Sequence, residues 1–149
     1  MTATRKKSGR CLCGAVHFSV EDAPQSIGVC HCAMCRRWSS GPFFALHCKG
    51  VVTFDGEQYV ERYKSSEWAE RGFCRVCGTN LFYRIVDSGE YIVSVGALDD
   101  QDGFVLDSEI FVDEQPPFYA FANETTKMTG AEVFAMFAPA GDGDGDGDG

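Results

Sequence analysis

The sequence contains no apolar segment that approaches the roughly 20 residues a membrane-spanning helix requires. Its first residues, 1–9, are short, basic and polar, and no apolar run follows them that could serve in a signal peptide. We therefore expect a cytoplasmic protein with no membrane partner. In that reducing compartment, eight cysteines favour metal binding or catalysis over a set of disulfides.

Positive charge is also scarce. The 13 Lys and Arg residues are outnumbered by 22 Asp and Glu residues, which gives a formal net charge of -9. Because an acidic surface repels phosphates, we expect no nucleic-acid partner, and chromatin binding is disfavoured.

A single domain is expected, because 149 residues with 44% hydrophobic composition can bury a core without disulfides. We place a flexible N-terminus at residues 1–8 and the domain at 9–138. Residues 139–149 are rich in alternating Gly and Asp, a composition that cannot bury apolar surface, so a disordered tail is predicted there.

Helical periodicity is rare in the sequence. Short alternating segments separated by Gly, Asp and Pro predict a mainly β, antiparallel fold instead. In residues 14–20, Val16, Phe18 and Val20 would face a core, with His17 on the opposite face. Further strands are expected at 42–48, 51–54, 79–86, 90–95 and 108–112. The best candidate helix spans 129–137, with Thr129 as N-cap and an apolar stripe of Val133, Phe134 and Phe137.

Seven of the eight cysteines form three clusters: C-L-C-G at 11–14, C-H-C-A-M-C at 30–35 and C-R-V-C-G at 74–78. Two cysteines that lie two or three positions apart on a tight turn can bind one ion, and Zn²⁺ prefers thiolates in a tetrahedral array. The CxC spacing favours zinc over an iron-sulfur cluster. We therefore expect two Zn²⁺ ions per chain.

The first and third clusters supply two thiolates each, and each cluster ends in Gly, which lets backbone amides approach the sulfurs. Pairing them predicts a closed structural zinc site made by Cys11, Cys13, Cys74 and Cys77. Such a site can contribute on the order of 10 kcal/mol of metal-binding free energy to folding.

The middle cluster supplies three cysteines, Cys30, Cys32 and Cys35. Three protein ligands with one further position are typical of a catalytic zinc ion. Two residues could close the site as a fourth ligand: His31, although it lies directly between two ligands, and Cys48, although a lone Cys on a strand is more often a small core residue.

Several motifs together resemble the glutathione-dependent formaldehyde-activating enzyme (GFA) family, which also contains centromere protein V. These are G-R-C-L-C-G at 9–14, C-H-C-A-M-C-R-R at 30–37, Y-K-S-S at 63–66, F-C-R-V-C-G at 73–78, G-A-L-D at 96–99 and I-F-V at 110–112. The resemblance covers residues 9–122 and implies an all-β, tent-like fold with few helices. It also implies a structural zinc ion at Cys11, Cys13, Cys74 and Cys77, and a second zinc ion at Cys30, Cys32 and Cys35 that faces the active site.

The activity that the resemblance implies is a carbon-sulfur lyase reaction, in which the thiol of glutathione adds to formaldehyde to give S-hydroxymethylglutathione. Arg36 and Arg37 could bind a carboxylate of glutathione, although paired arginines on a loop are often only solvated. His31 could take part in proton transfer beside the metal. Phe43 and Phe44 could line the pocket, but core positions are favoured for both.

Two other functions remain open at this stage. A non-catalytic, zinc-stabilised binding module could carry glutathione or bind a protein, and it would have a fourth protein ligand at the middle cluster and no adjacent pocket. A redox enzyme would use Cys48, whose neighbours His47 and Lys49 could lower the pKa of its thiol.

Overall fold

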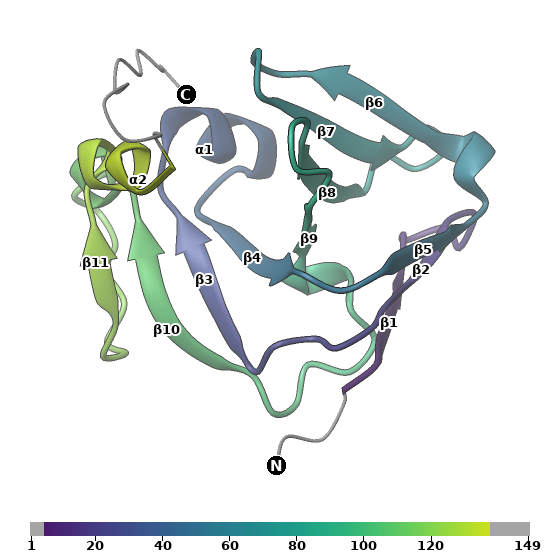
Figure 1. The fold of residues 1–149 in the computed structure, drawn as a ribbon, viewed down its shortest axis with the longest axis horizontal. Helices are drawn as coiled ribbons and strands as arrows, with labels where there is room; N and C mark the ends of the chain where they lie inside the picture. Colours follow the sequence, from purple (N-terminus) through teal and green to yellow (C-terminus); the bar gives the residue numbers. More distant parts are fainter. Residues whose placement is uncertain (1–4, 138–149) are drawn as a thin grey trace. The chain divides into compact units, whose positions relative to one another are not determined.

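The computed structural model describes residues 5–137, apart from the side chain of Phe137 (Figure 1). The predicted tail at 139–149 lies outside these residues. Within them, eleven strands, two α-helices and three short 3-10 helices confirm the predicted mainly β fold. No helix in this part of the chain is long and apolar enough to span a membrane.

The chain divides into two compact units. Unit 1 comprises Met1–Ile27 and Ala45–Val105, and unit 2 comprises Gly28–Phe44 and Leu106–Gly149. Strand β1 (Lys7–Arg10) begins two residues before the predicted start of the domain at residue 9. The remaining boundaries of the single predicted domain stay a prediction.

Unit 1 contains two antiparallel arrangements of strands. The first has the order β1-β2-β5, with β2 at His17–Val20 and β5 at Val52–Asp55. The second has the order β4-β9-β8-β7-β6 (Figure 1), with bounds Phe43–Cys48, Tyr91–Ser94, Asn80–Ile85, Ala69–Cys74 and Val60–Lys64. Two 3-10 helices, η1 (Glu57–Tyr59) and η2 (Val95–Ala97), complete the unit.

The core of unit 1 follows the predicted alternation. Val16, Phe18 and Val20 are buried, whereas His17 is exposed. Strands β4, β5, β8 and β9 confirm the expected segments, with ends shifted by at most one residue. Cys48 is buried among these apolar residues, and its thiol donates to the carbonyl of Leu46 at 3.4 Å, which confirms the small-core-residue interpretation.

Strands β6 and β7 were not predicted, because charged residues interrupt their apolar pattern. The structure satisfies those charges across the sheet: Arg62 Nη1 lies 2.8 Å from Glu70 Oε2, and Arg84 Nη1 lies 3.4 Å from the same oxygen. A three-residue ion-pair network of this kind depends on strand pairing, so no local sequence pattern reveals it.

Unit 2 contains strands in the order β11-β10-β3, with bounds Thr126–Met128, Val105–Ile110 and Ser26–Cys30. It also holds η3 (Val112–Glu114) and the helices α1 (Ala33–Ser39) and α2 (Gly130–Phe137). Helix α2 confirms the predicted helix and its cap: Glu132 N donates to Thr129 Oγ1 at 3.2 Å, and Thr129 N donates to Glu132 Oε1 at 2.7 Å. Val133 is buried, and Phe134 packs edge-on against Phe111 at 5.6 Å between ring centroids.

Helix α1 was not predicted. Its N-cap is Cys32, whose Sγ accepts a hydrogen bond from Cys35 N at 3.3 Å, in place of the Ser, Thr, Asp or Asn that usually marks a helix start. Arg36 and Arg37 therefore lie on a helix and not on the expected loop.

A glycine in β7 is under a tight packing constraint in unit 1. Gly72 lies directly across from Phe82 of β8, and a Cβ at position 72 would overlap the Phe82 ring.

We predict that Gly72→Ala lowers the free energy of unfolding by roughly 1–3 kcal/mol, because neither β7 nor β8 can move aside without breaking its pairing. Urea unfolding measures this loss. Gly96→Ala is the matched control, since a Cβ there has no neighbour within 4 Å; equal losses in both variants would contradict the packing argument.

Candidate metal centres

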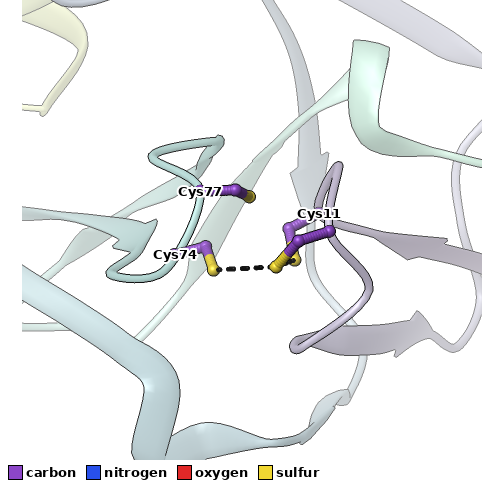
Figure 2. A group of neighbouring side chains, drawn as sticks. Cys11, Cys74 and Cys77 are labelled. Carbon is purple, nitrogen blue, oxygen red and sulfur yellow. Dashed lines mark hydrogen bonds between the residues drawn. The ribbon is translucent and has the colours of Figure 1, made fainter.

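The first metal centre is built by two turns of unit 1. Cys11 and Cys13 follow β1, whereas Cys74 ends β7 and Cys77 lies on the turn between β7 and β8. The sulfurs of all four cysteines lie within 4.8 Å of one another. Figure 2 shows the side chains of Cys11, Cys74 and Cys77 converging from these turns. The structure thus brings together the four residues that the sequence predicts for the structural site.

The sulfur spacing fits a tetrahedral metal ion. Cys11 Sγ lies 3.7 Å from Cys13 Sγ, which lies 3.9 Å from Cys74 Sγ. Metal–sulfur bonds of about 2.3 Å in a tetrahedral array require sulfur–sulfur distances of about 3.8 Å. These two distances fit an ion of the size of Zn²⁺, and all four sulfurs lie close enough together to be its donors.

The two turns present backbone amides to the sulfurs, as the glycine positions predict. Gly14 and Gly78 adopt φ of 85° and 83°, a region that favours glycine. Val16 N donates to Cys11 Sγ at 3.3 Å, and Val76 N donates to Cys74 Sγ at 3.4 Å. These hydrogen bonds stabilise thiolate sulfur over thiol.

Thr79 is a supporting residue of this centre that the sequence analysis missed. Its Oγ1 lies 3.2 Å from Cys77 Sγ and accepts a hydrogen bond from Leu12 N at 3.0 Å, so one hydroxyl links both turns. The Thr79 hydroxyl lowers the pKa of the Cys77 thiol to about 5. The sequence signal that could have identified Thr79 was a hydroxyl residue immediately after the C-x-x-C-G turn.

The second centre lies in unit 2, where β3 passes into α1. The sulfurs of Cys30, Cys32 and Cys35 lie within 4.8 Å of one another, and all three residues are buried. The nearby sulfurs of Cys32 and Cys35 raise the pKa of the Cys30 thiol far above its ordinary value. Because three thiolates at this separation repel one another, the cluster suits a bound cation.

His31 does not join the three cysteines. Its Nδ1 lies 2.6 Å from Tyr119 Oη and its Nε2 lies 2.9 Å from Glu109 Oε1, so both ring nitrogens have other partners. Within the described residues of unit 2, no fourth His, Cys, Asp or Glu belongs to the group of Cys30, Cys32 and Cys35. Cys48, the other residue considered as a ligand, lies in unit 1 with its thiol on the Leu46 carbonyl.

A pocket of about 660 Å³ lies beside helix α1 within unit 2. Arg36 and Arg37 line it together with Phe118, Tyr119 and small or proline residues. Arg36 Nε donates to the His31 carbonyl at 2.8 Å, which fixes the guanidinium next to the cysteine segment. Among the described carboxylates of unit 2, none forms an ion pair with Arg36 or Arg37. The pocket therefore suits an anionic ligand.

The structure also places three other residues that the sequence analysis considered, Phe43, Phe44 and His47, and each contacts another side chain of the fold. Phe43 is buried, as predicted, and packs against Trp38. The core prediction for Phe44 is wrong: 38% of it is exposed, and its ring packs edge-on against Phe121. His47 Nε2 pairs with Glu90 Oε1 at 2.7 Å between neighbouring segments of unit 1.

Comparisons with known proteins agree with this geometry. Residues 6–114 match the family described as "Glutathione-dependent formaldehyde-activating enzyme". An uncharacterized lyase of Schizosaccharomyces pombe is 33% identical over 126 residues, which cover 84% of this chain and 92% of the relative. A Halomonas elongata protein, provisionally named a glutathione-dependent formaldehyde-activating enzyme, is 29% identical over 83 residues. These residues cover 50% of this chain and 53% of that protein. The crystal structure of a Rhodobacter sphaeroides protein aligns with a TM-score of 0.51 and 28% identity, covering 62% of this chain and 87% of that one.

We predict that Thr79→Val weakens metal binding at the four-cysteine centre by about 10–100-fold, because the variant loses the hydroxyl that stabilises the Cys77 thiolate. Competition between the protein and a chromophoric chelator for Zn²⁺ measures the affinity. Thr126→Val, an exposed position on β11, is the control. Equal zinc retention by both variants would show that the Thr79 hydroxyl is dispensable.

Proposed function

This chain belongs to the glutathione-dependent formaldehyde-activating enzyme family, as its cysteine motifs predict, and we propose on that basis that it is a zinc-dependent carbon-sulfur lyase. It would add a thiol such as glutathione to a small aldehyde, or remove it, with formaldehyde as the family default. The observation that carries the proposal is the three-cysteine centre with no fourth ligand among the described residues of unit 2, next to an arginine-lined pocket. The name of the fission-yeast relative, a lyase, supports the same reaction class.

We assign one Zn²⁺ to each cysteine centre. Cys11, Cys13, Cys74 and Cys77 would hold a structural ion, because four thiolates complete a tetrahedral site. Cys30, Cys32 and Cys35 would hold the catalytic ion and leave one position for water or substrate. Zinc at such a site stabilises a thiolate at neutral pH and polarises a carbonyl oxygen.

The reaction needs no oxidant or reductant. In the adding direction, the thiol releases its proton and its sulfur forms a bond to the carbonyl carbon. The π bond of the carbonyl breaks, and its electron pair takes up a proton on oxygen, which becomes a hydroxyl group. The reverse direction breaks the same bond and regenerates thiol and aldehyde. Arg36 and Arg37 bind the carboxylates of the thiol substrate in the pocket of unit 2 and orient its sulfur.

The redox alternative is disfavoured by the surroundings of Cys48. Burial raises the pKa of the Cys48 thiol to about 12, although its sequence neighbours His47 and Lys49 suggested a lowered value. Because the thiolate is the reactive form, a buried thiol with a raised pKa is a poor nucleophile.

Metal analysis tests the assignment of the two centres. We predict two Zn²⁺ per wild-type chain and one per Cys32→Ser chain, with lyase activity lost and the circular dichroism spectrum retained. The reason is that the three-cysteine centre lies within a single short segment of unit 2, whereas the four-cysteine centre lies in unit 1. Elemental analysis of the purified proteins measures the content.

Cys48→Ser is the control for that experiment and should keep both ions and full activity, because Cys48 is a core residue. Unfolding of Cys32→Ser, or a single zinc ion in the wild type, would count against separate centres. Two zinc ions without any thiol-addition activity would instead favour a binding module that carries glutathione.

We predict that Arg37→Ala raises KM for glutathione by about 10-fold or more, because a charge-assisted hydrogen bond contributes roughly 1.5–3 kcal/mol. KM for 2-mercaptoethanol, which has no carboxylate, should stay within about twofold by the same argument. Steady-state kinetics with formaldehyde and each thiol measure both values. Lys64→Ala, which removes an exposed positive charge of unit 1, is the control; equal effects of Arg37→Ala on both thiols would refute a carboxylate site.

A further inference from the structure

A buried chain of polar side chains in unit 2 ends at the arginine-lined pocket. His31 is 0% exposed and Glu109 is 1% exposed, and they are joined by the contact between Nε2 and Oε1. Behind them, Thr125 Oγ1 donates to Glu109 Oε2 at 2.7 Å, and Lys127 Nζ lies 3.7 Å from that oxygen. In front, His31 contacts Tyr119, which lines the pocket.

The charge on Glu109 sets the direction of the hydrogen bonds that this side chain makes. Burial raises the pKa of this carboxyl, but hydrogen bonds from Thr125 and His31 and the charge of Lys127 outweigh burial and lower it below its ordinary value. Glu109 is therefore a carboxylate and accepts from the Nε2–H of His31. The other ring nitrogen of His31, Nδ1, shares a hydrogen bond of 2.6 Å with the Tyr119 hydroxyl.

The same contacts fix the Tyr119 side chain. Its ring packs against His31 at 5.5 Å and edge-on against Phe121 at 6.1 Å between centroids. Gln115 Nε2 donates to the Tyr119 backbone carbonyl at 2.6 Å, which anchors the loop that carries it. Because a phenol has one donor and two acceptor positions, the Tyr119 hydroxyl can make a further hydrogen bond besides its contact with His31.

A purely structural role accounts poorly for this arrangement. Burying a carboxylate and an imidazole costs desolvation energy that their attraction often only offsets, so apolar residues would stabilise unit 2 as well. Neither side chain belongs to the cysteine group. What the polar chain provides is one fixed orientation of the Tyr119 hydroxyl at the pocket.

We propose that Tyr119 binds the hydroxyl group of the thiol–aldehyde adduct through a hydrogen bond with its phenolic group, and that His31 and Glu109 are positioning residues for it. The inference rests on the proposed function and deepens it. Arg36 and Arg37 recognise the anionic end of the ligand, which thiol and adduct share. Tyr119 recognises the hydroxyl, which only the adduct has.

Two stable thioethers of nearly equal size separate these roles. S-(2-hydroxyethyl)glutathione carries a hydroxyl near the sulfur, whereas S-propylglutathione replaces that hydroxyl with a methyl group. Calorimetric titration of the zinc-loaded protein with each compound gives their affinity ratio. We expect the wild type to prefer the hydroxyl compound by roughly three- to tenfold, the range of a single neutral hydrogen bond.

Tyr119→Phe should abolish this preference and leave the affinity for S-propylglutathione unchanged. Tyr63→Phe, which alters an exposed tyrosine of unit 1, should keep the preference. Retention of the preference by Tyr119→Phe would overturn the inference and leave the proposed function standing. Failure of both thioethers to bind the wild type would overturn the proposed function, and the inference with it.

Glu109 tests the positioning role. Glu109→Gln should keep the hydroxyl preference, because an amide oxygen can still accept from His31 Nε2, whereas Glu109→Leu should lose it while still binding S-propylglutathione. Glu109→Gln could instead lose the hydroxyl preference as completely as Tyr119→Phe, with an unchanged thermal unfolding midpoint. That result would contradict positioning through the His31 hydrogen bond. Should Glu109→Leu fail to fold, the Gln variant and Tyr119→Phe decide the question.

Discussion

Cysteine sulfurs gathered within 4.8 Å of one another are stable as thiolates only when a cation shares their charge. In unit 1 this constraint acts across the chain, because Cys11 and Cys13 are 60 or more residues away from Cys74 and Cys77 in sequence. An ion bound there joins the end of β1 to the turn between β7 and β8 and so connects the two strand arrangements of the unit. The hydroxyl of Thr79 and the left-handed backbone conformations of Gly14 and Gly78 support this four-cysteine centre.

The same constraint acts locally in unit 2. Cys30, Cys32 and Cys35 come from six consecutive positions, so an ion bound by them closes no long loop and restricts few conformations of the unfolded chain. Its contribution to the fold is correspondingly smaller than that of the four-cysteine centre. Two centres with similar ligands would therefore differ in what they can do: a metal ion at the four-cysteine centre would hold distant segments together, and one at the three-cysteine centre would be available for chemistry at limited structural cost.

The sequence predicted what depends on neighbouring residues. Cysteine spacing identified both centres, and alternation identified the strands whose outer faces are polar, such as β2. It missed helix α1, because a cysteine sulfur replaces the usual N-cap oxygen, and it missed β6 and β7, because their charges are paired only across the sheet. His31 and Glu109 are 78 residues apart, and nothing near either residue indicates the other. Contacts that arise from tertiary pairing alone lie beyond the reach of local patterns.

The segment from Cys30 to Arg37 carries both the three-cysteine group and the two arginines of the pocket. Arg36 Nε donates to the carbonyl of His31, the residue between two of the cysteines, so the same short segment orients the guanidinium and the cysteine group. His31 in turn orients Tyr119 through its ring. In a chain with a net charge of -9, an anionic substrate experiences general repulsion, and binding depends on a local positive site. Because the two arginines of the pocket and the cysteine group all lie within the eight residues 30–37, their spacing stays constant when other parts of the chain move. The proposed reaction between a bound thiol and a small aldehyde would require such constant spacing.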